Sequence, residues 1–222
     1  MAQKQAKYRQ RGVKATVVTN TGQGRVAAAV GSRWAMILVV SLFVVMGIGS
    51  LIWASAATTT SSLWSASKVP QTISALDSQS VELGLKFKTQ YAGKVLGVKF
   101  YKGPLNIGQH IGTLWTGDGR KLATADFQNE TVTGWQTALF AQPVAITANT
   151  TYVVSYHAPS GNYAVNAQYF SRPHVSGDGV LRADSGAGMF TYGTLSAFPA
   201  TSTASNYWVD VLFSSSLLFP QP

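Results

Sequence analysis

The chain has 222 residues, a length that allows one folded core and little more. It has no cysteine, which excludes a disulfide scaffold, thiolate metal sites and cysteine nucleophiles. The formal net charge is +9, but residues 1–33 hold seven basic residues and no acidic one, so the rest of the chain is nearly balanced. This distribution excludes a domain that coats nucleic acid with a basic surface, and we expect no nucleic-acid partner.

Residues 1–33 have the composition of a disordered basic tail, and an uncharged apolar segment follows at residues 34–53. Twenty residues in a helix span roughly 30 Å, which matches the hydrocarbon core of a bilayer. Trp34 and Trp53 bracket the segment, as expected for indoles at two membrane interfaces. We therefore predict one transmembrane α-helix that acts as a signal anchor, with the lipid bilayer as its partner.

The orientation follows from the flanking charges. All the basic residues of the tail precede the apolar segment, so we expect a cytoplasmic amino end and an exported carboxyl part. A cleaved signal peptide is the alternative, because Ala54, Ser55 and Ala56 have the small-x-small pattern that signal peptidases accept. The protein would be secreted after cleavage near Ala56, and would otherwise be a single-pass cell-membrane protein with an extracellular domain.

Residues 54–68 are rich in Ser, Thr and Ala, and we predict a flexible linker there. Residues 69–214 form the exported domain, and residues 215–222 are a C-terminal tail. Within the domain, apolar residues recur with a period of two, which is typical of strands with one buried face. In Val81–Phe87, this period places Glu82 on the solvent face.

Further strand-like segments follow, separated by Gly, Pro and Asp turn signals. These segments are Leu96–Tyr101, Ile111–Thr116, Lys121–Phe127, Trp135–Phe140, Thr151–His157, Tyr163–Phe170, Val180–Ala183 and Asn206–Phe213. No segment of the exported part has a helical period. We therefore predict an all-β fold, an antiparallel two-sheet β-sandwich of jelly-roll or immunoglobulin-like type, with a closed barrel as the alternative.

Several short stretches of this domain have a specific order and spacing. They are Val81–Phe87, Val98–Gly103, His110–Trp115, Gly134–Gln136, Tyr152–His157 and Asn206–Val211. Together they resemble a bacterial family catalogued as domain of unknown function 4082, over about residues 69–214. The resemblance implies a β-sandwich module of exported bacterial proteins, often found beside immunoglobulin-like or carbohydrate-related domains, and hence binding at the cell surface.

Motifs for catalysis are missing from the exported part, which has no serine-nucleophile elbow, zinc-binding helix or phosphate-binding loop. His110, His157 and His174 lack the short spacings of metal ligands, so we expect no metal and no other cofactor. A glycosidase would need two neighbouring carboxylates, for which Glu130 and Asp210 are the candidates. We assign no catalytic residue, and a glycan-active hydrolase is the third interpretation.

Aromatic side chains that strand parity turns outward favour glycan binding, because sugar rings stack on aromatic faces while polar neighbours bond the hydroxyls. The predicted ligand-binding residues are Tyr101, Lys102, His110, Trp115, His157, Tyr163, Trp208 and Asp210. The first interpretation is thus a membrane-anchored, non-catalytic module that binds a glycan or another envelope component. The alternative is a structural or assembly module that contacts a partner protein through an exposed patch or strand edge.

The arrangement of these residues in space separates the interpretations. Tyr101, Lys102, His110, His157 and Trp208 gathered in one concave site would favour ligand binding. Scattered or buried positions would favour the structural module, and two close carboxylates in a cleft would reopen catalysis.

Overall fold

A computed structural model describes residues 59–215 of the chain. The predicted cytoplasmic tail (residues 1–33), the predicted transmembrane helix (residues 34–53) and residues 216–222 lie outside the described residues. Across the described part, no helix is long and apolar enough to span a membrane.

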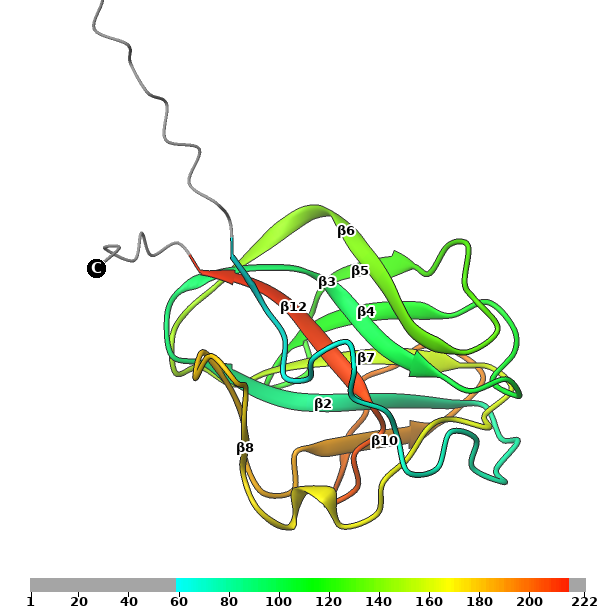
Figure 1. The fold of residues 1–222 in the computed structure, drawn as a ribbon. Coiled ribbons are helices and arrows are strands. Elements are labelled where there is room, and N and C mark those ends of the chain that lie inside the picture. The colour runs from blue at the N-terminus through cyan, green and yellow to red at the C-terminus, as the bar shows by residue number, and fades with distance from the viewer. Residues whose placement is uncertain (1–58, 216–222) are drawn as a thin grey trace, which may run out of the picture. The chain divides into compact units, whose positions relative to one another are not determined.

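The described residues form two antiparallel sheets, which confirms the predicted all-β sandwich (Figure 1). The smaller sheet contains, in spatial order, β1 (Thr60–Ser61), β12 (Val209–Ser215), β3 (Gly93–Lys102) and β6 (Gly134–Ile146). The larger sheet contains β11 (Thr201–Thr203), β10 (Gly188–Tyr192), β2 (Val81–Thr89), β7 (Tyr152–Ala158), β4 (Ile111–Thr116) and β5 (Lys121–Asp126). A short hairpin of β8 (His174–Val175) and β9 (Leu181–Ala183) extends β2.

The core consists of side chains that alternate inward along the strands of both sheets, as the period of two predicts. Its buried members include Leu83, Leu85, Phe87, Val98, Phe100, Tyr156, Val209, Val211 and Phe213. Phe100 of the smaller sheet stacks on Tyr156 of the larger one, with ring centroids 4.1 Å apart. Phe127 packs edge-on against the same Phe100 ring at 4.7 Å. These contacts join the two layers.

The sandwich has two distinct ends (Figure 1). The described chain enters through β1 and leaves through β12 at the same end, where Thr60 pairs with Ser214, and we call this the proximal end. At the opposite end, which we call the loop end, lie the connections at residues 72–80, 103–110 and 127–133. The antiparallel strands between them fix which residues reach which end.

One predicted strand, Tyr163–Phe170, is wrong. The chain makes only isolated bridges there, at Val165 and Asn166, and then a 3₁₀ turn at Tyr169–Ser171. Gln168 has a φ of 55°, so the backbone leaves the extended conformation before a ladder can form. The strands β1, β8, β10 and β11 were not predicted, since each is short or lies in a polar, Gly-rich stretch.

The predicted linker boundary at residue 68 also needs correction. Thr60–Ser61 pairs as β1 with β12, and Leu63 and Trp64 are only 3% and 2% exposed. Residues 60–68, which we call the strap, begin as the edge strand β1 and then pass over the outer face of the smaller sheet, where Leu63 and Trp64 donate to Asp210 of β12. The hydrophobic effect favours burial of these two side chains, so the folded domain begins before residue 68.

Candidate functional site

The predicted binding residues do not form one site. The structure divides most of them among three polar or aromatic clusters, each within the domain. The first cluster contains Lys102 and His110, the second contains Tyr101, Trp208 and Asp210, and the third contains Trp115 and His157. Tyr163 stands apart from these clusters at the loop end, where its hydroxyl donates to Asp77 Oδ2 at 3.0 Å.

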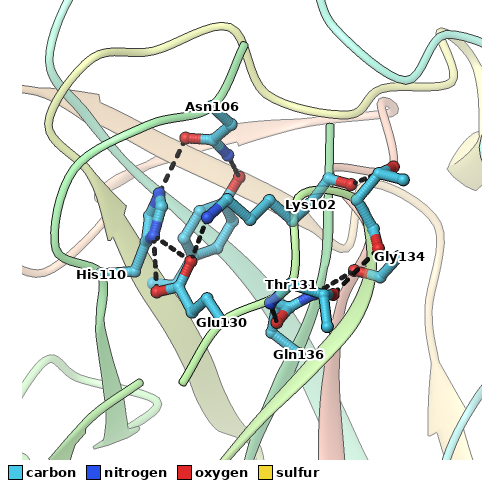
Figure 2. Close-up of polar contacts among 9 residues, drawn as sticks. Lys102, Asn106, His110, Glu130, Thr131, Gly134 and Gln136 are labelled. Carbon is cyan, nitrogen blue, oxygen red and sulfur yellow. Dashed lines mark hydrogen bonds and ion pairs between the residues drawn. The ribbon is translucent and has the colours of Figure 1, made fainter. Parts of the chain in front are cut away.

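The first cluster centres on a carboxylate between two basic side chains (Figure 2). Glu130 lies 2.7 Å from Nζ of Lys102, and its two oxygens lie 2.8 and 2.9 Å from Nδ1 of His110. Asn106 Oδ1 lies 2.9 Å from the other imidazole nitrogen of His110, and the Asn106 amide donates to the Tyr156 hydroxyl. The network therefore ties the loop at 103–110 to the core.

An open cleft of about 420 Å³ adjoins this cluster at the loop end. It is lined by Lys102, Gly108, Gln109, Phe127, Gln128 and Glu130. The side chains of Lys102 and Glu130 are 12% and 10% exposed, so only their tips can meet a molecule in the cleft. His110 is buried behind them and can act on the cleft only through Glu130.

The electrostatics of His110 combine two opposing effects. Burial is the larger one and lowers the pKa of His110, because the charged ring would lack the hydration that it has in water. The neighbouring Glu130 carboxylate raises this pKa, and the Lys102 ammonium lowers it again. The net direction is downward, which favours a neutral ring in the folded protein.

This lowered pKa predicts an acid-sensitive domain. Above the unfolded value, near 6.5, His110 is neutral in both states and its folded network is intact. As the pH falls below about 6.5, the unfolded chain binds the proton first, so the free energy of unfolding decreases. We expect the decrease to be shallower in His110→Gln, as measured by urea unfolding between about pH 8 and pH 5. Equal pH slopes in the two proteins would contradict this assignment.

The second cluster lies beneath the strap and is held by Asp210. Its carboxylate is fully buried, accepts the backbone N–H groups of Leu63 and Trp64 at 2.8 and 3.3 Å, and lies 3.4 Å from Nζ of Lys99. Burial raises the pKa of Asp210, while Lys99 and the backbone donors oppose that rise. Asp210 therefore fixes the strap to the sheet.

Aromatic rings complete this second cluster. Trp64 of the strap stacks on Trp135 and His174, with centroid distances of 6.4 and 5.8 Å, and packs against Trp208 at 5.7 Å. Tyr101 meets Trp135 edge-on at 5.7 Å. The rings of Tyr101 and Trp208, which were expected to stack on a sugar, thus contact Trp135 and Trp64 instead.

The third cluster lies on the outer face of the larger sheet. Glu82 is buried, its Oε1 accepts the Ser155 hydroxyl at 2.5 Å, and Ser155 Oγ accepts the Trp115 indole N–H at 2.7 Å. Nδ1 of His157 lies 3.4 Å from Glu82 Oε2. Phe198 packs edge-on against Trp115 at 5.8 Å, so the loop after β10 covers the cluster.

The carboxylates considered for catalysis lie apart. Glu130 pairs with Lys102 and Asp210 pairs with Lys99, at two separate positions along β3. Among residues 59–215, no group of three or more His, Asp or Glu side chains is arranged to hold a metal ion.

Two residues central to these clusters were missed by sequence reasoning. Asn106 lies in a loop and carries no periodic signal, while the alternation in β2 placed Glu82 on the solvent face. Only its position opposite His157 in the β2–β7 register, which the sequence does not contain, would have identified Glu82.

Comparison with protein families gives one finding. The family model described as "Domain of unknown function (DUF4082)" matches residues 67–209, which is more than half of the chain. No curated protein matches the chain.

Proposed function

The chain belongs to the DUF4082 family, and from this premise we propose that its exported domain is a non-catalytic structural or assembly module that contacts a partner protein. One observation carries the proposal: most of the side chains expected to bind a ligand instead contact other residues of the domain. His110, Trp115, Trp208 and Asp210 are each no more than 4% exposed. Such positions leave little surface for a ligand.

The loop end offers a surface for a partner. Its connections carry exposed aliphatic side chains, namely Ile73, Leu76, Leu105, Ile107 and Val132. Leu76 is 99% exposed and the other four are between 43% and 74% exposed. These connections are in contact with one another. Gly103 packs so closely on residue 73 that a Cβ atom there would lie 1.9 Å from the Ile73 carbonyl oxygen. The Thr133 hydroxyl donates to the Lys102 carbonyl. Exposed apolar groups on connections that contact one another are a feature of protein-binding surfaces.

The proposed location is the outer side of the cell membrane. The predicted helix at residues 34–53 would anchor the domain, and residues 54–59 would connect the two. A six-residue connection reaches at most roughly 20 Å when extended. Cleavage near Ala56 would instead release the domain with its strap complete.

Photo-crosslinking tests the protein-binding proposal. We expect a crosslinker placed at Leu76 in the full-length chain to give a discrete protein adduct in intact cells. Leu139, which is also exposed but lies on the outer face of β6, is the matched control and should give none. Ile107→Asp should abolish the adduct at Leu76 without lowering the melting temperature. Equal labelling at both leucines would contradict the proposal.

The polar cleft beside Glu130 supports a second candidate function, glycan binding. Its lining of Lys102, Glu130 and two glutamines can bond sugar hydroxyls. If the full-length chain binds immobilised glycans and Lys102→Gln loses this binding, the cleft rather than the aliphatic patch is the recognition site. The crosslinking result at Leu76 separates the two functions.

A further inference from the structure

Lys99 and Asp210 form an ion pair between β3 and β12. They stand directly opposite each other in the β3–β12 register, and Nζ lies 3.4 Å from Oδ2. The side chain of Asp210 is 0% exposed and that of Lys99 is 14% exposed. The strap covers Asp210, while Lys99 also lines an open cleft of about 460 Å³ beside the strap.

The two oxygens of Asp210 have different surroundings. Oδ1 accepts the backbone N–H groups of Leu63 and Val211, both at 2.8 Å. Two such donors on one oxygen are the arrangement that stabilises negative charge in the intermediates of acyl transfer. Oδ2 accepts two longer bonds, from the Trp64 backbone N–H at 3.3 Å and from the Lys99 amine at 3.4 Å. Oδ1 is thus the oxygen held for the negative charge, and Oδ2 is the one that can leave.

The amine of Lys99 is also held in place. It donates to the Ser62 hydroxyl at 3.3 Å and lies 4.9 Å from the centroid of the Trp135 ring. The Ser62 hydroxyl in turn donates to the Val211 carbonyl. The strap therefore contacts and positions both the Lys99 amine and the Asp210 carboxyl group.

From this geometry we propose that Lys99 and Asp210 condense to form an intramolecular amide bond. A proton passes from the ammonium to the carboxylate, which gives a neutral amine and a carboxylic acid. Nζ then attacks Cγ, the negative charge develops on Oδ1, and Oδ2 leaves as water with the protons lost by nitrogen. The product is one Nζ–Cγ amide and one water molecule, so the step needs no oxidant, metal or other reactant.

Two physical effects favour the reaction. Burial raises the pKa of Asp210, so the acid form that must be attacked is accessible. Groups held in contact by a fold react as if at very high concentration, with effective molarities on the order of 10⁵–10⁸ M.

A second lysine–carboxylate pair provides an internal comparison. Lys102 and Glu130 are closer, at 2.7 Å, but this carboxylate contacts His110 through both oxygens and borders the open cleft. Within residues 59–215, the Glu130 oxygens contact Lys102 and His110 and accept no backbone N–H group, so nothing comparable would stabilise negative charge on one oxygen. We expect no amide at this pair.

Mass spectrometry of the full-length chain tests the proposal. After denaturation and proteolysis, we expect a branched peptide that joins the Lys99 and Asp210 segments and weighs one water less than their sum. Lys99→Arg keeps the positive charge but removes the nucleophile, so the branched peptide should vanish. Lys102→Arg is the matched control and should leave it unchanged.

The outcomes are decisive in both directions. A branched peptide in the unmodified chain and in Lys102→Arg, but not in Lys99→Arg, supports the amide. Recovery of both segments from the folded, unmodified chain only as linear peptides overturns it. If the Lys99→Arg chain still weighs one water less than its sequence, the dehydration lies at other residues, and this result also overturns the proposed amide.

Discussion

Replacement of Trp64 by alanine is expected to lower the free energy of unfolding by about 3–5 kcal/mol, the usual cost of truncating a buried tryptophan. The indole is 2% exposed, packs on Trp135, His174 and Trp208, and donates to the Tyr169 hydroxyl at 3.1 Å. Its removal would leave a cavity and release the strap. Chemical denaturation monitored by circular dichroism measures the difference.

Val69→Ala is the matched control for this experiment. Val69 follows the strap but is 61% exposed, so its truncation should change the free energy of unfolding by less than about 0.5 kcal/mol. If Trp64→Ala were as stable as this control, the strap would not be part of the folded domain. The result matters for the family boundary as well, because the family match begins at residue 67 and leaves Trp64 out.

Glu82→Ala is expected to destabilise the domain by a similar amount, about 3–5 kcal/mol, because it breaks a buried polar network and leaves its partners unpaired. The Ser155 hydroxyl would lose its acceptor, and His157 would lose the carboxylate 3.4 Å away. Urea unfolding at neutral pH provides the measurement.

Asp126→Ala removes the same charge from an exposed position at the end of β5, so it is the control for Glu82→Ala. We expect its effect to stay within about 0.5 kcal/mol. Comparable decreases in the free energy of unfolding of the two variants would mean that net charge, and not the buried network, determines the stability. Glu82→Gln, which keeps an acceptor for Ser155, should lose less than Glu82→Ala.

The strands of the sandwich were largely predictable because a strand between core and solvent imposes a period of two on its sequence. The segment predicted at Ile111–Thr116 has the bounds of β4, and Val81–Phe87 lies within β2. The period fails where the backbone turns. Gln168, with a φ of 55°, ends the extended backbone inside the segment predicted as Tyr163–Phe170.

The burial of the outer faces could not be predicted, because the period of two says which face a side chain is on but not what covers that face. Glu82 lies on the expected face of β2, yet the loop after β10 closes over it. A Cβ added at the neighbouring Gly84 would lie 2.8 Å from Cγ of Pro199. Asp210 likewise lies under the strap. In both cases the covering segment comes from a distant or irregular part of the chain.

The strap also determines how the domain would bear mechanical tension. Its strand β1 runs antiparallel to β12 from the proximal end, and its contacts with Asp210 and Trp208 lie farther toward the loop end. A pull on the amino side, against a partner held at the loop end, would load these contacts in shear. They would have to rupture together, so the amino-terminal attachment should resist force better than one that peels apart bond by bond.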